Sequence, residues 1–131
     1  MRLLLDTHAF LWWFAGEDRL SADVVRLMEA PETFLVLSAA SSWEIAIKFR
    51  LGKLTLPEPP ESFVATRMVR EGIEGLPVQH SHALSVSSLP MHHRDPFDRM
   101  LIAQAMVEGL PILTADPAFA AYDVEVIPAG R

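Results

Sequence analysis

An unbroken run of three leucines beside the amino terminus, Leu3 to Leu5, most constrains what this chain can fold into. A strand with one covered face alternates apolar and polar residues, so an unbroken apolar run predicts a strand covered on both faces. Such strands lie inside parallel sheets. Asp6 follows where the run stops, and the apolar and aromatic residues 9–14 predict a helix directly after it. Because ligands of open α/β sheets bind outside the carboxyl ends of the strands, Asp6 is placed either for chemistry or simply to cap the helix.

The rest of the chain continues this alternation of short apolar runs and helical patterns. Strands are predicted at 34–37, within 73–78, at 111–114 and at 124–127, and helices at 22–30, 38–50, 61–71, 81–89 and 96–108, with a helical turn at 117–121. Ser21 is the expected N-cap of helix 22–30, Gly16 follows the first helix, and Gly52, Gly72 and Gly109 are expected to end later helices. Strands alternating with helices predict an α/β fold, a three-layer α/β/α sandwich around a central parallel sheet.

Length and composition favour a single globular domain over residues 1–131. Half of the 131 residues are hydrophobic and 21% are charged, and no linker, repeat or low-complexity tract interrupts the chain. The absence of cysteine excludes a disulfide scaffold, a thiolate metal site and a cysteine nucleophile. No apolar run approaches the roughly 18 residues of a membrane-spanning helix, and the amino terminus lacks a signal-peptide pattern. We therefore expect a cytoplasmic protein without membrane contact.

The charge balance restricts the kind of partner. Seventeen acidic against eleven basic residues give a net charge of −6, which argues against a general polyanion binder. The basic side chains are scattered, at Lys48, Arg50, Lys53, Arg67, Arg70, Arg94 and Arg99 among others. An enzyme whose acids surround metal ions stays possible, because two divalent cations would offset four of the negative charges.

Each of the prominent acids also has a purely structural explanation. Asp95 fits the N-cap of helix 96–108, with Pro96 at its first position, and Asp98 fits the third position of a capping box. Asp116, before Pro117, repeats the arrangement of a strand end, an aspartate and a proline. For Glu44, in the middle of helix 38–50, the simplest role is a surface ion pair with Lys48.

Capping does not explain why such acids recur at the matching ends of separate elements. Asp6, Glu44, Asp98 and Asp116 together predict a carboxylate cluster, which without metal would repel itself and retain protons. Oxygen-rich sites of this kind suit Mg²⁺ or Mn²⁺. One or two such ions would supply an activated water and stabilise a phosphorane-like oxygen.

Four stretches carry a resemblance to a known family. They are Leu4–Ala9, Ser42–Lys48, Arg94–Ala105 and Leu113–Asp116. In these stretches, which follow one another over essentially the whole chain, the sequence resembles the PIN-domain family and, more narrowly, the VapC toxins of bacterial type II toxin–antitoxin systems. The resemblance implies an α/β/α sandwich with the first strand central, and metal-dependent ribonuclease activity on an RNA substrate. It also implies a homodimer and a cognate antitoxin that covers the site.

The resemblance assigns the acidic, metal-binding and catalytic positions to Asp6, Glu44, Asp98 and Asp116. Asp98, and not Asp95, matches the family's third acid, because Asp98 stands seven residues before Ala105 in the Asp…Ile-Ala-x-Ala pattern. Asp95 then keeps the role of helix cap.

Several neighbouring side chains have open roles. His8, His92 and His93 could bind metal or RNA phosphate, although loop histidines more often do neither. Thr7 and Thr114 could orient carboxylates from behind. Arg99 could reach a phosphate or simply be solvated. Trp12 and Trp13 are adjacent on a helix, so one is expected to leave the core and mark a protein interface, unless the buried face is wide.

Two other kinds of function remain open at this point. The chain could be a non-catalytic α/β module for RNA or protein binding, in which the acids are only helix caps. An aspartate-nucleophile phosphatase or phospho-acceptor domain is a weaker alternative, because it would want a second acid close after Asp6, where His8 stands.

Overall fold

Five parallel strands make one sheet in the part of the chain that the computed structural model describes, residues 1–15 and 18–130. The strands are β1 (Arg2–Leu5), β2 (Phe34–Ser38), β3 (Glu74–Leu76), β4 (Ile112–Thr114) and β5 (Val126–Pro128), and their order across the sheet is β3-β2-β1-β4-β5. β1 is therefore central. It pairs with β2 on one side, with Leu3 opposite Leu35, and with β4 on the other, with Leu4 opposite Ile112.

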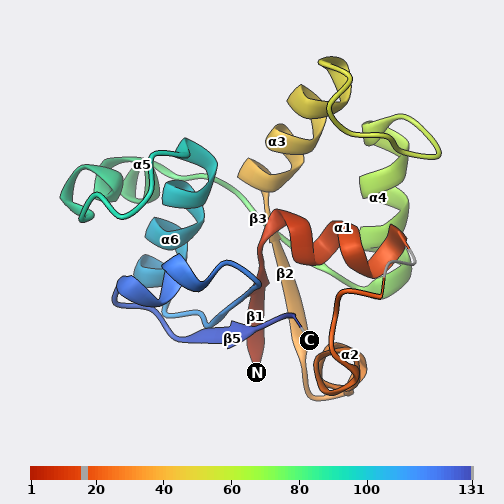
Figure 1. Ribbon diagram of the computed structural model, residues 1–131, viewed down its shortest axis with the longest axis horizontal. Helices are drawn as coiled ribbons and strands as arrows, with labels where there is room; N and C mark the ends of the chain where they lie inside the picture. Colours follow the sequence, from red (N-terminus) through yellow and green to blue (C-terminus); the bar gives the residue numbers. More distant parts are fainter. Residues whose placement is uncertain (16–17, 131) are drawn as a thin grey trace.

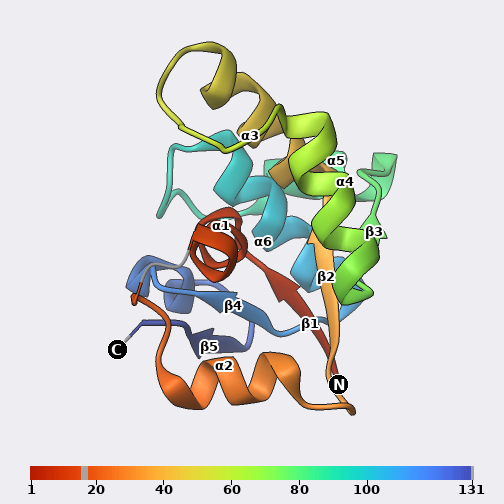
Figure 2. The same cartoon turned by 90° about the vertical axis from the view of Figure 1, so that its right-hand side faces the viewer.

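Helices cover both faces of this sheet (Figures 1 and 2). They are α1 (Thr7–Ala15), α2 (Ala22–Glu29), α3 (Ala39–Arg50), α4 (Pro60–Glu71), α5 (His80–Ser85) and α6 (Pro96–Glu108), with short 3₁₀ segments at Val86–Ser88 (η1) and Pro117–Ala121 (η2). In Figure 1, α5 and α6 lie to one side of β1 and β2, and α1, α2 and α4 to the other. The prediction of a three-layer α/β/α sandwich is confirmed.

The leucine run is buried because the sheet separates two hydrophobic cores. Leu3 and Leu5 pack into one core, together with apolar residues of α1, α2 and α4 such as Phe10. Leu4 packs into the other, with residues of α6 such as Ile102. All three leucines are fully buried, as expected of a strand covered on both faces.

Local signals set most of the element ends. The Ser21 hydroxyl accepts a hydrogen bond from the Val24 N–H, so Ser21 caps α2 as predicted. Gly72 and Gly109 end α4 and α6 with φ of 65° and 66°, a left-handed conformation that side chains disfavour. The helix expected at 81–89 is divided into α5 and η1. The predicted role of Gly16 lies outside the described residues.

The two tryptophans of α1 differ from expectation. Trp12 and Trp13 are both half-buried and both pack against the core that contains Phe10, so neither leaves it. The alternative of a wide buried face describes α1 better. Among the described residues, no helix has the length and apolarity needed to cross a bilayer.

Candidate metal centre

Asp6 lies at the carboxyl end of the central strand, where the chain turns from β1 into α1. One carboxylate oxygen, Oδ1, accepts a hydrogen bond from the Ala9 N–H at 2.7 Å, and the other, Oδ2, accepts one from the Thr114 hydroxyl at 2.5 Å. Asp6 is therefore a helix cap, and its second oxygen also faces the neighbouring strand end. Burial raises the pKa of Asp6 above its ordinary value, against the opposing effect of these hydrogen bonds.

Glu44 comes to the same place from the second turn of α3. The Ser38 side chain caps this helix by accepting from the Ala40 N–H, and it fixes where the helix leaves β2. The Glu44 carboxylate is buried and forms an ion pair with Lys48, one turn later. The i,i+4 pair expected from the sequence is thus present, but the carboxylate is not on the surface. Its charge acts on Asp6 and on Asp98.

The two aspartates at the start of α6 have different environments. One oxygen of Asp95 accepts hydrogen bonds from the N–H groups of Phe97 and Asp98, at 2.8 and 3.2 Å, so Asp95 is the N-cap as predicted. Asp98 does not reach back to complete a capping box. Within residues 1–15 and 18–130, its carboxylate accepts no hydrogen bond.

The unpartnered carboxylate of Asp98 carries the strongest electrostatic signal of the site. Its pKa is raised to about 7, mainly by burial and further by the negative charges of Asp95, Glu44 and Asp6, against a lowering effect of His93. A bound cation would favour the ionised form of this carboxyl group and so offset both the burial and the neighbouring negative charges. Asp98 therefore has the properties of a cation ligand.

Asp116 follows β4 and starts η2. Its Oδ1 accepts from the Ala118 N–H at 2.9 Å, and its Oδ2 lies 3.0 Å from Nε2 of His93. Burial by itself would raise the pKa of Asp116, but the hydrogen bonds from Ala118 and His93 outweigh it and lower the pKa. Asp116 is therefore an ionised carboxylate.

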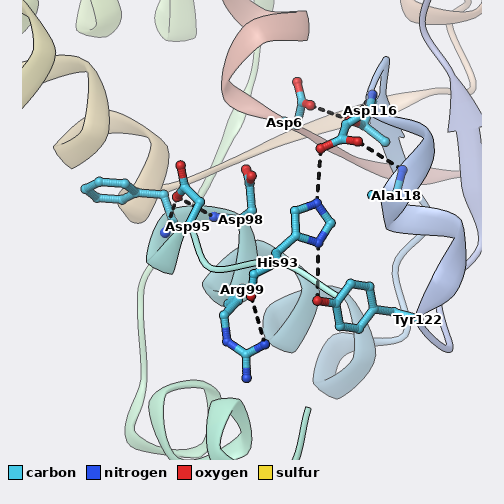
Figure 3. A network of polar contacts seen from close by, with 10 residues as sticks. Asp6, His93, Asp95, Asp98, Arg99, Asp116, Ala118 and Tyr122 are labelled. Carbon is cyan, nitrogen blue, oxygen red and sulfur yellow. Dashed lines mark hydrogen bonds and ion pairs between the residues drawn. The ribbon is translucent and has the colours of Figure 1, made fainter. Parts of the chain in front are cut away.

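These side chains converge (Figure 3). The carboxylates of Asp6, Asp98 and Asp116 face a common space, while that of Asp95 lies apart, over the start of α6. Ligand atoms of His93, Asp98 and Asp116 all lie within 4.8 Å of one another. The carboxylates of Asp6, Asp98 and Asp116 fit a divalent cation, and ligands that are all oxygen fit Mg²⁺ or Mn²⁺. The structure thus brings Asp6, Asp98 and Asp116 together, and Glu44 lies close enough for its charge to act on Asp6 and Asp98.

Predictions for the surrounding residues have mixed outcomes. Thr114 orients a carboxylate as expected, whereas the Thr7 hydroxyl donates to Ser41 and ties α1 to α3. The expectation that Arg99 reaches phosphate or solvent is wrong. Its guanidinium is buried and donates to backbone carbonyls of the loop before α6, those of Val86, Leu89, Pro90 and His93. A buried guanidinium needs such carbonyl acceptors, because it has five N–H donors and each is costly to bury without a partner.

His93 and Tyr122 show what the sequence reasoning missed. His93 contacts Asp116, whereas His92 is exposed and only packs against the Tyr122 ring. Tyr122 was not identified as a site residue, although its hydroxyl lies 3.2 Å from Nδ1 of His93. It is the single tyrosine of the chain, 29 residues after His93, and no motif spacing connects the two.

A cavity of about 270 Å³ adjoins the acids between α1 and α3. Its polar lining comes from Thr7, His8, Glu44, Lys48 and Lys53. His8 is exposed at this position, and its ring lies 6.2 Å from that of Trp12. Two lysines thus lie beside Glu44 in a protein that is acidic overall, and one of them, Lys48, forms an ion pair with it.

Comparison with known proteins identifies the family to which this fold and its acidic centre belong. The family model described as PIN domain matches residues 3–125, so the chain belongs to the PIN-domain family. Ribonuclease VapC16 of Mycobacterium tuberculosis is 43% identical over 88 residues, which cover 58% of this chain and 62% of that protein. Ribonuclease VapC22 of the same organism is 30% identical over 116 residues, which cover 87% of this chain and 86% of that one. The resemblance to VapC proteins is confirmed.

Solved structures support the fold. A chain of VapBC2 from Rickettsia felis, crystallised with a DNA fragment from their promoter, superposes with a TM-score of 0.73 over 98% of this chain and 99% of that one. Sequence identity is only 13%, so this likeness shows the α/β/α fold alone. The match to VapC16 spans less than two thirds of that relative's length.

Proposed function

We propose that the protein is a metal-dependent endoribonuclease and the toxin of a type II toxin–antitoxin pair. The observation that carries the proposal is Asp98, a half-buried carboxyl group with no hydrogen-bond partner and a pKa of about 7, beside Asp6, Glu44 and Asp116. A helix cap would have N–H partners, as Asp95 has. The names of the two VapC relatives, both ribonucleases, support RNA as the substrate.

The residues that would hold Mg²⁺ or Mn²⁺ are Asp98 and Asp116, with Asp6 and Glu44 completing the cluster. A bound ion of this kind activates water for attack and stabilises the charge that develops on the phosphate. Hydrogen bonds to both of its oxygens hold Asp6 in one orientation before any ligand arrives. The neighbouring Lys48 and Lys53, which line the adjoining cavity, would contact the RNA backbone.

The remaining parts of the proposal follow from the family. Among the solved structures with this fold are a toxin–antitoxin complex and a member of the VapBC family of toxin–antitoxin systems, which supports a cognate antitoxin as a partner of this chain. A homodimer, a cytoplasmic location and a single domain over residues 1–131 complete it.

Cleavage of RNA with and without metal tests the activity. We expect a fluorescent RNA to be cut by the wild type in Mn²⁺ or Mg²⁺, to survive in chelator, and to survive with Asp6→Asn in either condition. Asp6→Asn keeps the size of the side chain, so circular dichroism should show that the variant folds. RNA that is bound but not cut by the wild type in every metal would favour the non-catalytic module. A covalent phosphate trapped on Asp6 would favour the phosphatase alternative.

A further inference from the structure

A chain of hydrogen bonds leads from the core to one of the acids of the metal centre. The Tyr122 hydroxyl lies 3.2 Å from Nδ1 of His93, and Nε2 of His93 lies 3.0 Å from Oδ2 of Asp116 (Figure 3). The His93 ring packs edge-on against Phe119 and stacks on Tyr122, with centroid distances of 4.9 and 5.5 Å. The His93 side chain is only 8% exposed, so the ring has a single position.

The direction of the hydrogen bonds follows from Asp116. An ionised carboxylate only accepts, so Nε2 of His93 carries a proton and donates it to Oδ2. In the neutral ring, Nδ1 is then an acceptor, and the Tyr122 hydroxyl donates to it. Tyr122 thereby selects the tautomer that Asp116 needs.

Asp116 needs such support more than Asp6 does. Its side chain is 41% exposed, and it stands on the loop between β4 and η2 rather than inside the sheet. The Ala118 N–H donates to Oδ1. Without His93, Oδ2 would have no hydrogen bond, and the carboxylate group could rotate more freely. Each carboxylate oxygen has two lone-pair sites, so both oxygens keep one for a cation while they accept these bonds.

We propose that His93 is a positioning residue that holds the Asp116 carboxylate in its metal-binding orientation, and that Tyr122 sets the tautomer of His93 for this task. The inference rests on the proposed function in taking Asp116 as a metal ligand. Partners of this kind commonly matter because they fix the orientation of a ligand before the metal binds.

Titration with Mn²⁺, followed by calorimetry, tests the positioning role. We expect His93→Leu to weaken Mn²⁺ binding by about 10–100-fold, as loss of such a partner usually does. His93→Gln, which retains an N–H donor, should recover most of that loss. His92→Leu is the matched control, since His92 touches the same Tyr122 ring but not Asp116, and it should bind Mn²⁺ like the wild type. Equal affinities in the His93→Leu and His92→Leu proteins would overturn the proposal.

Nitrogen-15 NMR of the imidazole gives a readout that a merely structural role would not move. We expect the proton of His93 on Nε2 in the metal-free wild type, and a mixture of tautomers in Tyr122→Phe, which keeps the stacked ring. A proton on Nδ1 in the metal-free protein would overturn the positioning role of His93 without contradicting the metal centre. A proton that moves from Nε2 to Nδ1 when Mg²⁺ is added would make His93 itself a ligand, which also overturns it. A wild type that binds no Mn²⁺ at all would instead contradict the metal centre.

Discussion

The acids of the centre divide into two groups, those with protein partners and one without. Asp6 is held by Ala9 and Thr114, Glu44 pairs with Lys48, and Asp116 is held by Ala118 and His93. Asp98, by contrast, accepts no hydrogen bond in the described part of the chain. The fold therefore orients three carboxylates in advance and leaves the charge of the fourth uncompensated.

The same contrast recurs within one turn of α6, between Asp95 and Asp98. Both are aspartates at the start of one helix, and both sit where a negative charge suits the helix dipole. Of the two, only Asp95 accepts hydrogen bonds from backbone N–H groups, and it does so through Oδ1. Position in a helix thus does not by itself distinguish a helix cap from a metal ligand. The hydrogen-bond partners of the carboxylate oxygens make that distinction.

The largest expected effect is that of Asp98→Asn on activity. Removing the unpartnered charge should lower metal-dependent RNA cleavage by orders of magnitude, because a ligand is lost. The metal-free protein should become as stable as the wild type or more stable, since a repelling charge has gone. Cleavage assays and thermal unfolding in chelator measure both effects. As a control, Glu32→Gln removes one exposed charge just before the amino end of β2, opposite to the end that carries the acids. It should change neither RNA cleavage nor thermal stability. Full activity in Asp98→Asn would contradict the assignment of Asp98 as a metal ligand.

Metal should stabilise the wild type through the same centre. A ligand that binds only the folded state at 100 times its Kd adds about 2.7 kcal/mol to the free energy of unfolding. We expect a clear rise in melting temperature with millimolar Mg²⁺ or micromolar Mn²⁺, and little rise in the double variant Asp6→Asn, Asp98→Asn. Differential scanning calorimetry at fixed pH measures it. An equal rise in both proteins would place the bound ion elsewhere.

Asp95→Ala should have the opposite profile to Asp98→Asn. Loss of the two hydrogen bonds to the first turn of α6 should lower the free energy of unfolding by about 0.5–2 kcal/mol. Metal-dependent cleavage should be largely retained. Urea unfolding together with the RNA assay distinguishes the two aspartates. If Asp95→Ala abolishes cleavage at unchanged stability while Asp98→Asn retains it, the assignment of cap and ligand is reversed.

The last contrast concerns the pH dependence of stability. The pKa of Asp98 rises from 3.8 to about 7 on folding, so between these values the folded protein holds more protons than the unfolded chain. Stability of the metal-free protein should therefore fall as the pH rises through this window and level off above it. Urea unfolding in chelator from pH 4.5 to 8 should show a steeper fall for the wild type than for Asp98→Asn. Parallel curves would contradict the raised pKa.

Much of this arrangement is encoded locally and could be predicted. The leucine run predicts the central strand, Ser21 and Asp95 mark helix starts, and Gly72 and Gly109 mark helix ends. These signals depend on backbone geometry within a few residues, which the sequence shows directly. Asp6 and Asp116 stood out because the carboxyl ends of parallel strands meet at one edge of the sheet, whereas Glu44 and Asp98 were assigned through the family resemblance.

The partners of the acids could not be predicted in the same way. Tyr122 reaches His93 only because η2 folds back over the loop before α6, a contact set by tertiary packing. Arg99 has the sequence position of a surface cation, yet the loop carbonyls around it make burial favourable. Thr7 and Thr114 look alike in sequence, and only the geometry shows that Thr114 faces Asp6.

The hydrogen bond between Thr114 and Asp6 joins residues 108 positions apart, and it has a consequence for biosynthesis. The central strand is synthesised before Asp98, β4 and Asp116, because these follow it in the chain. At typical elongation rates this delay is on the order of ten seconds. A nascent or truncated chain that ends before α6 carries Asp6 and Glu44 without Asp98 and Asp116. Under the proposed function, the growing polypeptide is harmless to the RNA around it until Asp98, β4 and Asp116 have been added.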